Sequence, residues 1–361
     1  MAAVAETARL AATIVLYVAL NSSLNLLNRY TLGHAGFRYP VLLTCAHLAF
    51  QTLALAPVVL GGGASPKGGK ASSWSNALAS HEETVMKHWR GIAAIGVLMA
   101  ANVALNNASL LHLQISYNQV IRASTPVVCA ACAVFVEGVV PKPSEALGLV
   151  LVTAGVMSTV GASSGAGGGG DAGSQKTGHE TLGVAFAASA TLANALLMTL
   201  SGKLMGGDRI DALKLTFYVS PVVLLALLPV GMHAEWDSMT EKYAIASVSA
   251  TEPDFVAGEP LTRLILLGCV IAVCYNWVHN KIISVTSATT TTVLGNVKVV
   301  TIMLSSRMLF GETKDWTLGM VAGAGVALFG FALYSAAKLR TKLEKEKAED
   351  ARGGATQRGG R

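Results

Sequence analysis

The sequence predicts an all-α integral membrane protein of about ten transmembrane helices, arranged as two inverted five-helix repeats. The composition supports the membrane assignment, because 52% of the 361 residues are apolar and only 13% are charged, whereas soluble domains carry about 25% charged residues. Apolar stretches of roughly 20 residues, enough to cross a bilayer, recur along the chain. The same short motifs also recur in its two halves. Lipid is therefore the expected solvent.

The candidate spans are apolar runs of about the length that a helix needs to cross the hydrocarbon layer. We expect the Gly-, Ser- and Lys-rich residues 61–90 to form a flexible loop, and residues 233–260 to form a polar, acidic loop. The spans lie near residues 9–32, 39–60, 91–111, 116–136, 144–161, 181–205, 211–232, 261–283, 286–310 and 316–337.

A glycine-rich stretch near the middle of the chain separates the two predicted halves. It includes the run Gly-Gly-Gly-Gly-Asp-Ala-Gly-Ser, a composition typical of flexible linkers. The end of the chain carries alternating Lys and Glu, which predicts a solvated tail with a short helical start. The predicted parts are a cytosolic N-terminus (1–8), a first five-helix repeat (9–161), a linker (162–180), a second five-helix repeat (181–337) and a cytosolic charged tail (338–361).

The distribution of Lys and Arg predicts that both termini are cytosolic. With ten spans, the basic loop 61–90, the connection after the sixth span and the basic tail share one side of the bilayer. The acidic residues of 233–260 fall on the other side, as the positive-inside rule expects. Arg29 and Arg38 run against this bias.

An internal repeat supports the inverted arrangement. In each half, a Glu at the end of one span is followed by a Leu-Gly pair and then an Ala-Gly-Val triplet. Because each half has an odd number of spans, the two halves must insert in opposite directions, and such folds place the substrate site at the repeat interface near the midplane. The motifs are Glu137, Leu147-Gly148 and Ala154-Gly155 in the first half, and Glu312, Leu318-Gly319 and Ala324-Gly325 in the second.

Two cations lie inside predicted spans, Arg122 in the fourth and Lys298 in the ninth. A charge at the bilayer centre costs at least about 2.5–3.5 kcal/mol, so such residues usually face a cavity. The two stand at similar distances before Glu137 and Glu312, and neither span offers a nearby acid. We therefore expect them to converge on one site whose counter-charge is the substrate. A phosphate group would suit the fork of Arg and the point charge of Lys.

Polar side chains in other spans are further candidates for substrate binding. Tyr275 could stack on a sugar or base, and it shares a helical face with His279. Amide side chains could bind hydroxyl groups or, equally, form contacts between helices. The predicted binding residues are Arg122, Lys298, Tyr275, Asn118, Asn296, Asn276, Asn106 and Asn25.

Several other functions are disfavoured by the residue pattern. The five cysteines lie in apolar runs without the His or Cys partners of a metal site, so we expect no metal or cofactor. Basic residues occur without interleaved aromatic residues, which argues against nucleic-acid binding. A membrane enzyme would need paired carboxylates or a metal cluster in a cavity, so we expect no enzyme. A membrane adaptor without transport activity is a further alternative.

The two basic segments carry a family resemblance. Asn-Gln-Val-Ile-Arg-Ala-Ser-Thr-Pro at 118–126 and Gly-Asn-Val-Lys-Val-Val at 295–300 resemble signature segments of the nucleotide-sugar/triose-phosphate translocators, in the drug/metabolite transporter superfamily. Residues 21–30, Asn-Ser-Ser-Leu-Asn-Leu-Leu-Asn-Arg-Tyr, resemble the first helix of that family. The likeness extends over roughly residues 10–335.

The resemblance implies a ten-helix inverted-repeat antiporter that exchanges phosphorylated solutes. In the sugar-phosphate branch, a Lys of the fourth helix, a Lys-Arg pair of the ninth and a Tyr of the eighth bind substrate. Arg122, Lys298 and Tyr275 match these positions, whereas Val299 replaces the Arg of the pair. This departure favours exchange of a nucleotide sugar for a nucleoside monophosphate over exchange of a sugar phosphate or other organophosphate for phosphate.

The expected location is the Golgi or ER membrane rather than the plastid envelope, because no Arg- and Ser-rich transit sequence precedes the first span. We expect the lipid bilayer and a small anionic phosphorylated substrate as partners and no nucleic acid, and we leave a homodimer open.

Overall fold

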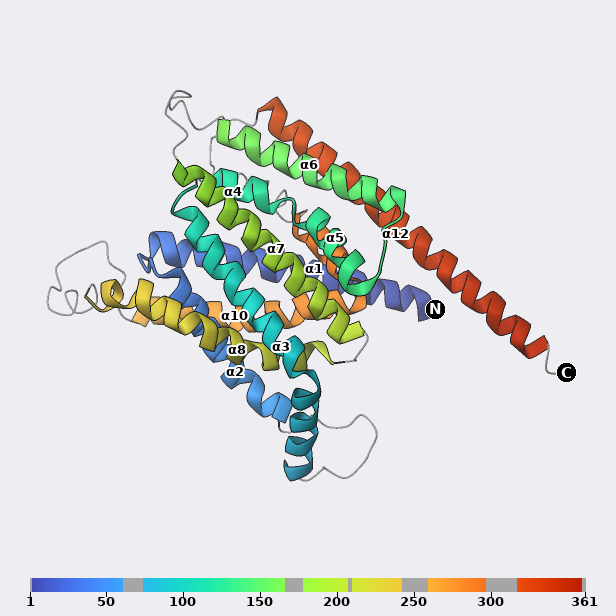
Figure 1. Ribbon diagram of the computed structural model, residues 1–361, viewed down its shortest axis with the longest axis horizontal. Coiled ribbons are helices and arrows are strands. Elements are labelled where there is room, and N and C mark those ends of the chain that lie inside the picture. Colours follow the sequence, from blue (N-terminus) through green and yellow to red (C-terminus); the bar gives the residue numbers. More distant parts are fainter. Residues whose placement is uncertain are drawn as a thin grey trace.

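The structure is a computed structural model that describes residues 2–60, 74–113, 115–165, 178–206, 210–241, 259–296 and 317–358. Within these ranges the regular secondary structure is helical (Figure 1). Further helical runs cover residues 236–241 and 288–296. The labelled elements are α1 (Ala2–Arg29), the π-helical turn η1 (Tyr30–His34), α2 (Pro40–Leu60), α3 (Trp74–Leu110), α4 (Ile115–Arg122), α5 (Thr125–Glu137), α6 (Pro143–Gly165), α7 (Gly178–Gly206), α8 (Ala212–Ala234), α10 (Glu259–Val285) and α12 (Leu318–Arg358).

The helices are those of a multi-pass membrane protein. Among the described residues, eight helical stretches are long and apolar enough to cross a bilayer. A shorter apolar stretch in α6, Pro143–Thr159, covers most of the predicted fifth span. Most of the predicted ninth span lies outside the described residues. For the residues that the structure describes, the all-helical membrane fold is thus confirmed, and the number ten stays a prediction.

Three predicted polar segments are more helical than expected. In the predicted acidic loop 233–260, residues 236–241 form a helical run and α10 already begins at Glu259. α3 begins at Trp74, so the prediction of a flexible loop is wrong for residues 74–90. That stretch contains neither Gly nor Pro and has many strong helix formers, which explains its helical structure. α12 continues to Arg358, so the tail extends the last helix much further than the short helical start that we predicted. The Gly-rich linker falls largely on residues 166–177, outside the described ranges.

The predicted fourth span is interrupted between α4 and α5. Pro126 lies in the first turn of α5 and has no N–H to donate to the preceding turn, so the helix breaks at residues 123–124. Ser124 Oγ donates to the Ile121 carbonyl over 2.7 Å. The amide of Asn296 donates to the Ala123 carbonyl over 2.7 Å and thereby ties the break to the 288–296 helix.

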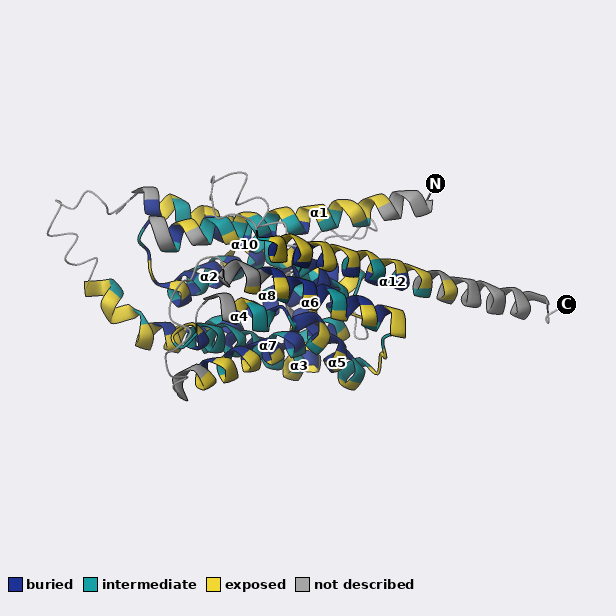
Figure 2. Ribbon diagram, turned by 90° about the horizontal axis from the view of Figure 1, so that it is seen from above, coloured by how far each residue is buried: buried dark blue, intermediate teal, exposed yellow. Residues whose placement is uncertain are grey.

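The described helices pack in pairs that join the two halves of the chain. α6 packs against α12, and α2 packs against α8. α3 contacts α7 and α8, while α10 contacts α1 and α2. In Figure 1, α6 and α12 lie side by side along one edge of the bundle. Buried residues gather where the helices face one another, and exposed residues lie on the outer faces (Figure 2). The outer faces are those that lipid would cover.

Glycines bring α6 and α12 into backbone contact. A Cβ on Gly148 would lie 2.7 Å from the Tyr334 nitrogen, and one on Gly323 would lie 2.7 Å from the Thr159 nitrogen. A Cβ on Gly155 would lie 2.4 Å from the Ala327 nitrogen, and one on Gly330 would lie 2.6 Å from the Val152 nitrogen. Such close approach is possible only without a side chain. This glycine seam, defined by Gly148, Gly155, Gly323 and Gly330, joins residues 148–159 of α6 to residues 323–334 of α12.

The seam fixes the register between the two helices. Gly148 and Gly323 are 175 residues apart in sequence, and so are Gly155 and Gly330. The residues that they contact on the opposite helix show the same separation. Glu137 and Glu312 have the same separation. The repeated sequence motifs instead paired Gly155 with Gly325, but a Cβ on Gly325 would meet nothing within 4 Å. The motif alignment of these two helices was therefore out of register by several residues.

A carboxylate from beyond α8 caps the start of α2. Glu235 Oε1 accepts from the Val41 N–H at 3.0 Å, and Oε2 accepts from the Leu42 N–H at 2.9 Å. The Tyr39 hydroxyl donates to the Ser238 carbonyl over 2.9 Å. The first N–H groups of a helix have no partner within it, and its N-terminus attracts negative charge. Glu235 thus joins one end of the first half to one end of the second.

Candidate functional site

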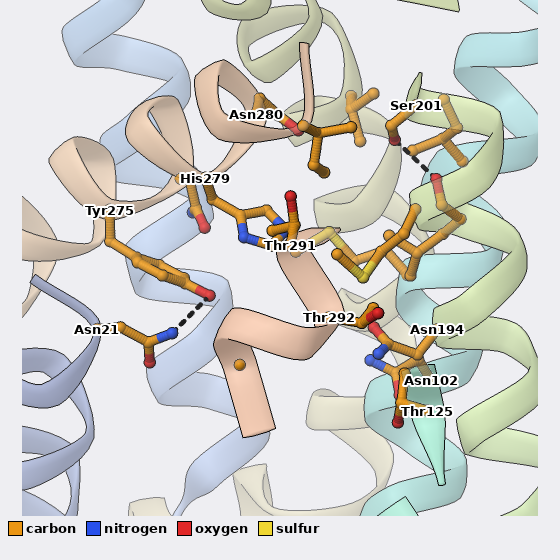
Figure 3. Close-up of a pocket in the computed structure, with 18 of the residues that line it drawn as sticks. Asn21, Asn102, Thr125, Asn194, Ser201, Tyr275, His279, Asn280, Thr291 and Thr292 are labelled. Atoms are coloured by element: carbon orange, nitrogen blue, oxygen red, sulfur yellow. Dashed lines mark hydrogen bonds between the residues drawn. The ribbon is translucent and has the colours of Figure 1, made fainter. Parts of the chain in front are cut away.

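A cavity of about 380 Å³ lies between the two halves. In the first half of the chain, the described residues that line it come from α1, α2, α3, α4, α5 and α6. In the second half they come from α7, α8, α10 and the 288–296 helix. In Figure 3, Tyr275, His279 and Asn280 project from α10, while Asn194 and Ser201 project from α7. Its volume is in the range of small-molecule sites.

Arg122 is the one charged side chain among the described residues that line the cavity, and no carboxylate accompanies it there. Its Nη1 group donates to Asn106 Oδ1 at 2.9 Å and to Asn102 Oδ1 at 3.3 Å. Both asparagines lie on α3. The partners are uncharged, so they orient the guanidinium without neutralising it. The cavity therefore holds a positive charge that an anion could match.

Asn106 and Asn118 lie behind the arginine rather than on the cavity surface. Neither is among the lining residues. Asn118 is fully buried, and its amide donates to Ser109 Oγ, which itself donates to the Asn106 carbonyl over 2.8 Å. These bonds connect α4 to the end of α3. The structure thus groups Asn106 and Asn118 with Arg122, without placing them against a solute.

Three rings form an aromatic cluster at another wall of the cavity. The ring centroids of Tyr17 and Tyr275 are 5.9 Å apart and nearly parallel, and His279 lies 5.6–5.7 Å from both. The amide of Asn21 donates to the Tyr275 hydroxyl over 3.3 Å (Figure 3). Asn25 donates to the side-chain and backbone oxygens of Asn21 and does not line the cavity. The cluster offers aromatic faces next to hydrogen-bonding groups.

Amide and hydroxyl groups connect α10 to α2 and α8. Asn276 donates to Gln51 Oε1 at 2.7 Å, and the Gln51 amide donates to Ser220 Oγ. One turn on, Asn280 donates to Thr216 Oγ1 at 2.8 Å. All of these residues line the cavity. Its wall is therefore rich in groups that can also bind hydroxyls or a nucleobase edge.

Of the remaining predicted residues, Asn296 lines the cavity and also holds the helix break through Ala123. Lys298 lies outside the described residues, so its position stays a prediction. Sequence reasoning did not select Gln51, Tyr17 or Asn194, although each lines the cavity. Polarity in an apolar span was the available signal for Gln51 and Asn194. Within the described ranges, no three His, Cys, Asp or Glu side chains converge as metal ligands would.

Comparison with known proteins identifies similar transporters. The profile of the Triose-phosphate Transporter family matches residues 8–335. A probable sugar phosphate/phosphate translocator of Arabidopsis thaliana is 27% identical over 324 residues, which are 89% of this chain and 93% of the relative. The UDP-uronic acid transporter 1 of the same plant is 26% identical over 93% of this chain and 97% of that protein. One of its GDP-mannose transporters is 22% identical over 89% of this chain and 84% of the relative.

A solved crystal structure shares the fold. It has a TM-score of 0.58 and 14% sequence identity, over 91% of this chain and 98% of that chain. At this identity the likeness concerns the fold alone. It extends over almost all of both chains.

Proposed function

Because the chain belongs to the Triose-phosphate Transporter family and is a multi-pass membrane transporter, we propose that it exchanges phosphorylated solutes across an endomembrane. The proposed cargo is a nucleotide sugar, returned as a nucleoside monophosphate. Both termini would face the cytosol, and the membrane would be that of the Golgi or ER. Such an exchanger moves solutes without catalysis, so the proposal includes no enzymatic step.

The observation that carries the proposal is the unneutralised guanidinium of Arg122 in the cavity. Burying a charge at membrane depth costs at least about 2.5–3.5 kcal/mol. The described cavity wall offers it only neutral groups. A phosphate group would supply the missing negative charge and could accept two parallel N–H donors from one guanidinium. Lys298, as a predicted second cation, would add to this attraction.

The packing of the helices supports an inverted repeat with the site at its centre. In an inverted repeat, α3 of the first half corresponds to α10 of the second, and α1 and α2 correspond to α7 and α8. The contacts of α3 with α7 and α8 therefore have counterparts in the contacts of α10 with α1 and α2, and all four helix pairs are in contact. Each glycine of the seam in α6 has a counterpart in α12 that lies 175 residues later in the sequence. The cavity takes residues from both halves. This is the arrangement from which alternating access around a fixed site is built.

A nucleotide sugar suits the cavity better than a small sugar phosphate. The aromatic cluster of Tyr17, Tyr275 and His279 offers ring faces to a base or sugar, and the amide network offers partners to hydroxyls. Val299 replaces the second cation of the sugar-phosphate branch. The UDP-uronic acid and GDP-mannose transporters are consistent with this cargo. Exchange of a sugar phosphate for phosphate is the second candidate, favoured by the similarity to probable sugar phosphate/phosphate translocators.

Counterflow in proteoliposomes tests the proposal. Vesicles preloaded with UMP, GMP or inorganic phosphate would be offered labelled UDP-sugars, GDP-sugars and triose phosphate. We expect a nucleoside monophosphate inside to accelerate uptake of a nucleotide sugar, and Arg122→Ala to abolish that uptake while the protein stays folded. Acceleration by inorganic phosphate alone would support the second candidate and contradict the first. Undiminished uptake by Arg122→Ala would contradict the phosphate site itself.

A further inference from the structure

The guanidinium of Arg122 is held by one of its nitrogen atoms. Both hydrogen bonds to α3 come from Nη1, toward the Oδ1 atoms of Asn102 and Asn106. In the described part of the chain, Nη2 and Nε have no hydrogen-bond partner. Arg122 lines the cavity, so these donors remain available to a solute while Nη1 fixes the plane of the group.

The two acceptors on α3, Asn102 and Asn106, have the size and shape of an aspartate side chain but carry no charge. An aspartate at either position would place an anion within hydrogen-bonding distance of Arg122. A buried ion pair of that kind would satisfy the arginine within the protein and compete with an anionic solute. Asparagine orients the guanidinium with the same oxygen geometry and leaves its charge unmatched.

We propose that Asn106 and Asn102 are positioning residues that keep Arg122 charged, oriented and unpaired for the phosphate of the solute. The inference rests on the proposed function, because it assumes that Arg122 binds the transported anion. Asn106 does not line the cavity, so it acts through Arg122. The bonds from Asn118 to Ser109 and from Ser109 to the Asn106 carbonyl brace this part of α3 against α4. Arginine, its two amide acceptors and this brace form one unit.

The test adds a negative charge without changing the shape of the side chain. Asn106→Asp would be compared with Asn107→Asp, which adds the same charge at the next position of α3. The probes are UMP binding, measured as its stabilisation of the purified protein against heat, and counterflow of a nucleotide sugar against UMP. We expect Asn106→Asp to raise the KM about 10-fold or more, with a smaller change in maximal rate and no loss of thermal stability without ligand. Asn107→Asp should keep a KM close to that of the parent protein.

A second variant keeps the test decisive if Asn106→Asp does not fold. Asn102→Asp places its charge on the other acceptor of Nη1 and should give the same rise in KM. A parental KM in a folded Asn106→Asp or Asn102→Asp variant would overturn the inference. If Asn106→Asp and Asn107→Asp lost stability equally and raised the KM equally, the inference would also be overturned, because this result would indicate general damage to α3. If Arg122→Ala transports normally, the proposed function fails; if Arg122→Ala is inactive and both aspartate variants at 102 and 106 are unimpaired, only this inference fails.

Discussion

At the scale of single residues, Arg122 brings a permanent charge and a planar set of donors to the cavity. Lysine would preserve the charge but could not bond both asparagines of α3 and present a fork to phosphate. We expect Arg122→Lys to lower kcat/KM for exchange about 10- to 100-fold, the effect of losing one or two charge-assisted hydrogen bonds, and to remain more active than Arg122→Ala. Initial rates of counterflow measure this. Arg38→Lys, at an exposed position outside the cavity, is the matched control and should change little.

Equal activity of Arg122→Lys and the parent protein would show that charge alone matters. Equal inactivity of the Lys and Ala variants would show that the planar fork is indispensable. Only an intermediate value agrees with the two bonds from Nη1 to Asn102 and Asn106. The comparison therefore separates the electrostatic role of the residue from its geometric role.

The sequence pointed to some cavity residues because an unusual residue type in an apolar span needs a polar environment. Arg122 was selected for this reason, whereas Tyr275 was selected for its ring face and the family resemblance, and both line the cavity. The same argument could not separate Asn106, which lies behind Arg122, from Asn102, which faces the cavity one helical turn away. Which side of a helix faces the cavity depends on how α3 packs against α7 and α8. Tyr17 was missed because an aromatic residue in a membrane helix is unremarkable in sequence.

At the scale of elements, the glycine seam predicts that one methyl group can disrupt the α6–α12 pair. A Cβ at Gly155 would lie 2.4 Å from the Ala327 nitrogen and 2.7 Å from the Gly323 carbonyl oxygen, atoms of the backbone that cannot rotate away. We expect Gly155→Ala to destabilise the protein by about 1–3 kcal/mol, as overpacking typically does, with a lower Tm in detergent. Gly161→Ala is the control on the same helix, because nothing lies within 4 Å of its added Cβ.

The control should keep or slightly raise Tm, since Ala is a better helix former than Gly. A Tm loss shared by both variants would indicate that α6 tolerates no substitution, and a loss confined to Gly161→Ala would contradict the seam. The motifs in the sequence indicated that glycines recur in both halves. They could not give the register, because Gly325 has the same local sequence as Gly155 but points to open space.

The cap on α2 gives a second prediction at this scale. Glu235 accepts from two backbone N–H groups of α2, so Glu235→Gln would leave one of them without its carboxylate oxygen and would remove the charge at the helix N-terminus. We expect the contact to weaken by about 1–2 kcal/mol. Cysteine labelling at residue 42 should become faster, because this end of α2 would separate from α8 more often. Glu241→Gln, at an exposed acid on the same side, should leave labelling unchanged; equal labelling in both variants would contradict the role of the cap.

At the scale of the whole molecule, exchange requires that the two halves separate at one face while the site between them stays intact. The two kinds of contact between the halves differ in this respect. The glycine seam joins α6 and α12 through backbone atoms over about three helical turns, so opening it would break several close contacts at once. The contact between Glu235 and the start of α2 is confined to one end and is polar, so water can replace it when it opens. We therefore expect α2 and α8 to move apart at that end while α6 and α12 stay together.

Cross-linking distinguishes these two interfaces in the intact transporter. A cysteine pair at Leu42 and Glu235 would be joined by a short thiol-specific cross-linker, and the control pair would replace Lys142 and Glu344, which form an ion pair beside the α6–α12 interface. We expect the first cross-link to lower the rate of counterflow at least 10-fold relative to the same variant without cross-linker. If the linker is cleavable, a reducing agent should restore the rate. The second cross-link should leave counterflow nearly unchanged, because it ties elements that remain in contact throughout the cycle. Inhibition by the second cross-link alone would place the moving interface at α6 and α12 and contradict this division of the molecule.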